Sequence, residues 1–139
     1  MKGIGLVALQ GWGIALLRVV VGIVFTMHGG QKLFVVGFGG VAGFLGQVGV
    51  PAPMLSAVVV TLVEFLGGLA LLAGFLTRWA AIPLSIDMVV AILTVHLPGG
   101  FFLPKGYEFA LTLLGATLAL ACLGSGEASV DRLLEERKA

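Results

Sequence analysis

The sequence is poor in charged side chains, and this scarcity restricts its class more than any other feature. Charged residues make up 11% of the 139 positions and hydrophobic residues 59%, whereas a soluble domain carries about 25% charged residues. A soluble protein with so few polar groups could not cover its surface. The composition therefore predicts an integral membrane protein. With 8 basic against 7 acidic residues, the chain has no basic face, which excludes nucleic acid as a partner.

Cysteine is also scarce, since Cys122 is the single one. One cysteine excludes a disulfide within the chain and a C-x-x-C dithiol pair. A metal site is not predicted either. The histidines and the carboxylates Glu64 and Glu108 are suitable ligand types, but no local spacing such as E-x-x-H supports a site.

Long apolar segments are abundant, and four of them approach the roughly 20 residues that a membrane-spanning helix needs. They cover residues 12–34, 54–76, 79–97 and 107–123. The second and third segments are so close that they must form a tight antiparallel hairpin. The predicted fold is an all-α integral membrane antiparallel four-helix bundle. A signal peptide needs a basic N-terminal region, and Lys2 alone is a weak one. Arg18 also interrupts the first apolar segment, so we expect this helix to be retained and not cleaved as a signal.

The connection at residues 35–53 is rich in glycine, yet its apolar residues recur at helical spacing at Val41, Phe44, Leu45 and Val48. We therefore expect a short interfacial or re-entrant helix between the first two spans. Residues 1–126 form one membrane domain in this scheme, and residues 127–139 form a charged cytoplasmic tail.

Basic residues predict the orientation of the bundle, because they gather on the cytoplasmic side of membrane proteins. One side holds Lys2, Arg78, Arg132, Arg137 and Lys138, and the other holds Lys32 and Lys105. We expect both termini in the cytoplasm and the protein in the cell membrane.

Ionisable residues interrupt the apolar segments, where a central charge costs about 2.5–3.5 kcal/mol on translocon scales. Glu64 lies inside the second segment, next to Gly67 and Gly68, whose small size allows a neighbouring helix to approach. With the helical rise of about 1.5 Å per residue, one set of polar residues falls in the outer half of the bilayer. These predicted ligand-binding residues are His28, Lys32, Glu64, His96 and Glu108.

Arg18 and Asp87 fall at a similar depth in the inner half, which predicts a structural ion pair between them. Asp87 and His96 are about half a turn out of phase on an ideal helix, so we expect them in different sites. Structural interpretations stay open for the outer residues as well. Glu64 could only neutralise Lys32 or His28, and Glu108 could be a helix N-terminal charge stabilised by the dipole.

Short segments along nearly the whole chain share an ordered pattern of glycine, aromatic and ionisable residues. They include Leu17-Arg18-Val19, His28-Gly29-Gly30-Gln31-Lys32-Leu33-Phe34, Glu64-Phe65-Leu66-Gly67-Gly68, Gly74-Phe75-Leu76-Thr77-Arg78, Gly106-Tyr107-Glu108 and Ser129-Val130-Asp131. This pattern resembles the DoxX family of small four-helix membrane proteins. The resemblance implies a link to redox chemistry, because the family's name comes from membrane subunits associated with thiosulfate:quinone oxidation. More distant four-helix proteins include cargo receptors, chaperones and sterol isomerases, and a shared fold does not fix an activity.

These observations predict a membrane subunit that binds a quinone-like or other amphipathic lipid-soluble molecule. No intrinsic cofactor is expected, so electrons would come from a redox partner protein. A non-enzymatic transporter, lipid carrier or assembly factor is one alternative, and a lipid double-bond isomerase is another. A homo-oligomer also stays open.

Overall fold

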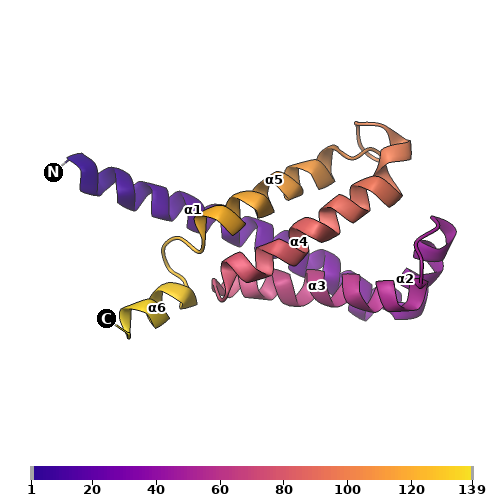
Figure 1. Ribbon diagram of the computed structural model, residues 1–139, viewed down its shortest axis with the longest axis horizontal. Coiled ribbons are helices and arrows are strands. Elements are labelled where there is room, and N and C mark those ends of the chain that lie inside the picture. Colours follow the sequence, from indigo (N-terminus) through magenta and orange to yellow (C-terminus); the bar gives the residue numbers. More distant parts are fainter. Residues whose placement is uncertain (1, 139) are drawn as a thin grey trace.

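The computed structural model describes residues 2–138, and these residues form helices joined by short connections (Figure 1). The elements are α1 (Lys2–Gly30), η1 (Gln31–Val36), α2 (Gly37–Gln47), α3 (Pro53–Ala73), α4 (Thr77–Ala91), η2 (Ile92–His96), η3 (Leu97–Gly99), α5 (Glu108–Leu123) and α6 (Val130–Glu136). The segments η1 and η2 are π-helical, and η3 is a 3₁₀ turn. The predicted all-α class is confirmed.

Three helical runs are long and apolar enough to cross a membrane: Gly5–Gln47, Pro53–Ala73 and Thr77–Gly99. The fourth apolar helix, Glu108–Leu123, is shorter. Helix α1 packs along α3, and α4 packs along α5. Both termini lie at one end of the molecule, whereas α2 and the connection into α5 lie at the other end (Figure 1). Successive long helices therefore run in opposite directions.

The predicted short helix after the first span is present as α2. It continues from α1 through η1, and the chain bends at Gly37, whose φ of 73° is accessible to glycine without strain. Val41 and Leu45 of α2 are buried against Ala57 of α3. The apolar spacing thus predicted the helix, whereas its interfacial or re-entrant placement stays a prediction.

Glycines allow α1 and α3 to approach closely, as expected for helices packed in lipid. A methyl group added at Gly22 would lie 2.9 Å from the backbone nitrogen of Leu72. One added at Gly68 would lie 2.6 Å from the hydroxyl of Thr26. The expectation that Gly68 faces a neighbouring helix is confirmed. Glu64 precedes Gly68 by four residues, so it lies on the same face of α3.

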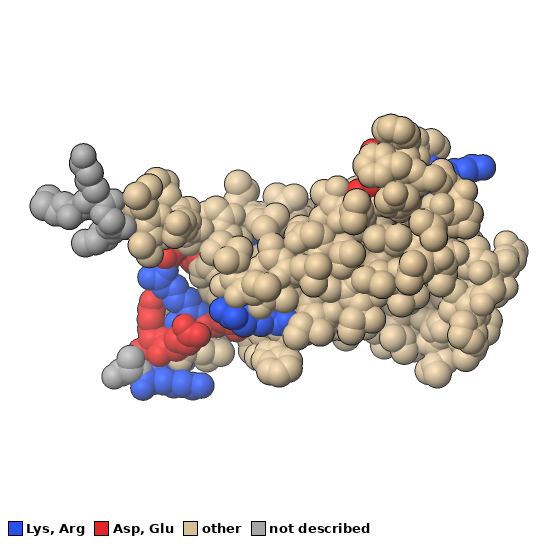
Figure 2. Space-filling model, turned by 45° about the horizontal axis from the view of Figure 1, so that its top comes forward, with Lys and Arg blue, Asp and Glu red and all other residues tan. Residues whose placement is uncertain are grey.

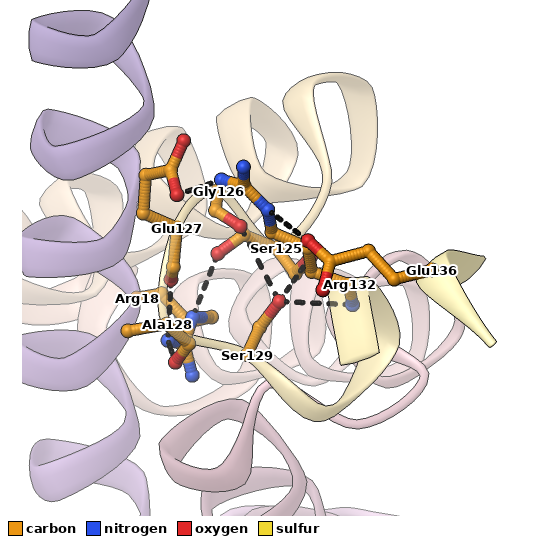
Figure 3. Close-up of polar contacts among 8 residues, drawn as sticks. All are labelled: Arg18, Ser125, Gly126, Glu127, Ala128, Ser129, Arg132 and Glu136. Carbon is orange, nitrogen blue, oxygen red and sulfur yellow. Dashed lines mark hydrogen bonds and ion pairs between the residues drawn. The ribbon is translucent and has the colours of Figure 1, made fainter. Parts of the chain in front are cut away.

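The predicted ion pair between Arg18 and Asp87 is wrong. Arg18 is only 1% exposed, and its guanidinium binds backbone carbonyl groups instead of a carboxylate. It donates hydrogen bonds to the carbonyl oxygens of Leu71 (2.6 Å), Leu72 (2.9 Å), Ser125 (2.9 Å), Ala128 (2.9 Å) and Glu127 (3.4 Å). Figure 3 shows the guanidinium against the segment that follows α5.

The physical reason is that a helix leaves its last carbonyl groups unpaired, and a guanidinium carries five N–H donors. Leu71 and Leu72 belong to the last turn of α3, where a positive charge also interacts favourably with the helix dipole. Arg18 therefore connects α1 to the end of α3 and to the segment after α5.

The C-terminal segment contributes to the same end of the molecule. The Asp131 carboxylate accepts hydrogen bonds from the backbone N–H groups of Leu76 (2.7 Å) and Thr77 (3.0 Å), which begin α4. Ser129 caps α6 by accepting a hydrogen bond from the Arg132 N–H group. Charged side chains gather at this end (Figure 2). The boundary at residue 126 stays a prediction, but the predicted tail begins as a packed part of the fold.

Replacing Arg18 with glutamine should lower the free energy of unfolding by at least about 3 kcal/mol, because several buried carbonyl groups lose a charged donor. Thermal unfolding in detergent, followed by circular dichroism, measures the loss. Arg137→Gln is the control, since Arg137 is exposed. Combining Arg18→Gln with Asp87→Asn should give additive effects on stability. If Asp87→Asn instead rescues Arg18→Gln, the two residues interact in the wild-type protein, and the ion-pair prediction would hold against the structure.

Candidate functional site

A pocket of about 550 Å³ lies among the helices at the end away from the short α3–α4 connection. Its volume is within the range of roughly 300–1,000 Å³ that small-molecule sites occupy. Helix α3 ends and helix α4 begins at their short connection, and the two helices diverge toward the pocket end (Figure 1). The pocket uses the space between them, with α1, α2 and α5 completing the wall.

The lining is mostly apolar, and its exposed members mark where the pocket opens. Leu55 and Val59 of α3, and Ile86 and Val90 of α4, line the pocket and are also exposed. The opening between α3 and α4 is therefore bordered by hydrophobic side chains. In a membrane, such an opening admits molecules from the hydrocarbon phase more easily than ions from water.

Lys32 and Glu64 form an ion pair inside the pocket. Lys32 lies on η1 and Glu64 on α3, and the Glu64 side chain is 6% exposed. Pairing offsets the cost of moving both charges out of water. One ammonium hydrogen is used by Glu64, and the group has three. Lys32 thus keeps donors for a bound molecule. The ion pair also agrees with the structural interpretation, in which Glu64 neutralises Lys32.

Both histidines line the same pocket. His28 precedes Lys32 by one helical turn, and its ring lies 6.0 Å from the ring of Phe109 on α5, measured between centroids. His28 is exposed, and His96 at the end of η2 is half-buried. The structure therefore brings together four of the five predicted ligand-binding residues.

Glu108 is the exception. It does not line the pocket, and its Oε1 atom accepts a hydrogen bond from the Leu103 N–H group at 2.7 Å. The Glu108 carbonyl accepts a second bond from Thr112. Glu108 begins α5, so the structural interpretation as a helix N-terminal charge fits its position. Glu108 is therefore not part of the candidate site.

Asp87 lines the pocket as well, although the sequence placed it elsewhere. It is 9% exposed, its Oδ2 atom is buried with no hydrogen-bond partner within residues 2–138, and its carboxyl group lies close enough to Glu64 to interact. The expectation that Asp87 and His96 occupy different sites is wrong. It assumed an ideal α-helix, whereas the helix becomes π-helical at Ile92, and the wider turns change which way His96 points.

An all-helical fold with long apolar helices and an internal apolar pocket defines a small multi-pass integral membrane protein. The chain belongs to the DoxX family, which its sequence matches over residues 13–97, more than half of its length. This confirms the resemblance found in the sequence.

The relatives span most of the chain. It is 39% identical over 132 residues to "Uncharacterized membrane protein Rv3486" of Mycobacterium tuberculosis, covering 87% of this chain and 80% of the relative. It is 35% identical over 133 residues to "Inner membrane protein YqjF" of Escherichia coli, covering 93% and 97%. It is 34% identical over 119 residues to "Putative oxidoreductase CatD" of Bacillus subtilis, covering 86% and 84%. No solved structure matches the chain.

Removing the positive charge of the pocket should destabilise the fold. Lys32→Met leaves the buried Glu64 carboxylate without its cation and should lower the free energy of unfolding by about 3 kcal/mol. The double variant Lys32→Met/Glu64→Gln should recover much of this loss. A double-mutant cycle on thermal unfolding measures the coupling, with the exposed Lys105→Met as control. Simple addition of the single losses would contradict a stabilising pair.

Proposed function

We propose that the protein is a membrane subunit that binds a quinone-like or other amphipathic lipid-soluble molecule in this pocket, within a redox system. The observation that supports it is the combination of an apolar opening with a polar interior. Leu55 and Ile86 border the opening, whereas Lys32, Glu64 and Asp87 lie inside. Such a site suits a molecule with an apolar tail and a small polar head.

The residues of the pocket fit a quinone head group. Lys32 and the histidines His28 and His96 carry N–H donors suited to carbonyl oxygens. When bound, a quinone accepts two electrons and takes up two protons. A partner protein would supply the electrons, and an imidazole ring can take up and release protons. Lys32 stabilises negative charge that develops on an oxygen next to it.

The comparison with relatives supports the redox part of this proposal. One relative carries an oxidoreductase name. That name describes the relative, and its transfer to this chain depends on the two proteins sharing the pocket residues. Two other relatives are named inner membrane proteins of Escherichia coli. These names support the cell membrane as the location of this chain, and we propose four spans with both termini in the cytoplasm.

A lipid double-bond isomerase is the second candidate, because two carboxyl groups meet in the pocket. Glu64 and Asp87 lie close together in a largely apolar wall. A carboxyl group in such a place can move a proton between the two ends of a shifting double bond. An isomerase would turn over its lipid without a redox partner, whereas the redox subunit requires one.

The ligand hypothesis predicts that lipophilic molecules co-purify with the protein and that Glu64→Gln loses them. Mass spectrometry of the organic extract measures retention, and Glu135→Gln on α6 is the control. The double variant Lys32→Met/Glu64→Gln is the decisive arm, since its charges balance again. It should regain thermal stability and still lack the ligand. Full retention by this variant would favour the carrier or assembly-factor alternative, in which the charges only stabilise the bundle.

The orientation is tested by cysteine labelling in intact cells, in a Cys122→Ala background because Cys122 is exposed. A membrane-impermeant maleimide should modify a cysteine placed at Gly39, which is exposed and has open space around it. A cysteine at Ala128, beside α6, should react only after the cells are opened. The reverse pattern would place the termini outside.

A further inference from the structure

Asp87 is the polar residue of the pocket whose bonding is left incomplete. Its Oδ2 atom is buried and accepts no hydrogen bond from residues 2–138. The ammonium group of Lys32 binds Glu64, and no ion pair within the described part of the chain reaches Asp87. A buried carboxyl oxygen without a donor is unfavourable, since it has lost its bonds to water.

The other ionisable groups around the pocket do not resolve this. Glu64 of α3 lies beside Asp87, and like charges at short range repel. Lys32 of η1, His28 of α1 and His96 of η2 complete the ionisable lining. The Glu64 carboxyl group lies close enough to Asp87 for a hydrogen bond, but it has no proton to donate while both carboxyl groups are ionised. With both carboxyl groups ionised, the Oδ2 atom lacks a donor, and the pocket is where a bound molecule can supply one.

We propose that Asp87 contacts the ligand, and that its carboxyl oxygen accepts a hydrogen bond from a hydroxyl group of the bound molecule. The pocket then prefers a lipid-soluble quinol or phenol to the quinone with the same tail. This inference rests on the proposed function, because it requires that the pocket binds such a molecule.

A hydroxyl group fits this position better than a charged amine. The opening between α3 and α4 is bordered by exposed apolar side chains such as Val59 and Val90, and an ammonium ion would enter it at a high desolvation cost. A phenolic hydroxyl is a neutral donor that enters with its apolar tail.

Preference for the quinol has a redox consequence. A molecule that binds more tightly in its reduced form is easier to reduce when bound. Tenfold tighter binding of the quinol raises the two-electron potential of the bound pair by about 30 mV. The pocket would thus draw electrons from the partner toward its ligand.

The test is anaerobic calorimetric titration of the full chain in lipid nanodiscs with three probes: a decyl-substituted benzoquinone, its quinol, and the quinol dimethyl ether. Wild-type protein should bind the quinol about tenfold more tightly than either other probe, as expected for one hydrogen bond to a charged or polarised acceptor. Asp87→Asn should reduce this preference to about threefold or less, because the amide donates as well as accepts.

Ser85→Ala is the control. Ser85 is a buried polar residue of α4 that binds Thr117 and does not line the pocket, so its variant should keep the tenfold preference. Equal binding of quinol and dimethyl ether by the wild-type protein would overturn the role of Asp87 and point to a shared proton or a water molecule as the donor. An unchanged preference in Asp87→Asn would overturn it too. Failure of all three probes to bind would instead overturn the proposed quinone-type ligand.

Discussion

The cost of placing charge in an apolar environment governs this structure more than any other constraint. Hydrocarbon offers no hydrogen bonds, so each polar group must find its partner within the protein. Arg18 and Lys32 lie on the same first helical run, and the chain pairs them differently. Arg18 binds the carbonyl groups of other segments, whereas Lys32 binds a carboxylate of α3. Both solutions hold α1 against α3.

These two solutions give the ends of the molecule different properties. At the end with the termini, Arg18 and Asp131 bind backbone groups of three segments and so join the helix ends. At the opposite end, the Lys32–Glu64 pair faces a pocket of about 550 Å³. Bonds to the backbone leave little capacity for a ligand, whereas ionised side chains in a cavity keep unused donors and acceptors. The Lys32–Glu64 pair therefore has two roles, since it joins η1 to α3 and also faces the pocket.

Much of the fold followed from the sequence because hydrophobic length and spacing are local properties. The apolar segments, the tight turn before Thr77 and the helix around Val41 and Leu45 were predicted in this way. Glu64 and Lys32 were found because charge inside an apolar segment is a strong signal. The partner of Arg18 was not predictable, since backbone carbonyl groups carry no residue identity. The packed path of residues 125–128 across the helix ends decides that bond.

The error over Asp87 and His96 has its cause in helix geometry. Depth along a helix needs only the rise per residue, and it grouped His28, Lys32 and Glu64, which line the same pocket. The direction in which a side chain points can be predicted only if the number of residues per turn is constant. The chain departs from the α-helical value twice, in η1 with Lys32 and in η2 with His96. Irregular turns of this kind disturb regular backbone bonding, so they persist where the altered direction of a side chain is useful. Both irregular turns lie beside the pocket that Asp87 and Glu64 share. Because π-helical turns are frequent at functional sites, their position beside the pocket supports the proposal that ligand binding occurs at this end of the bundle.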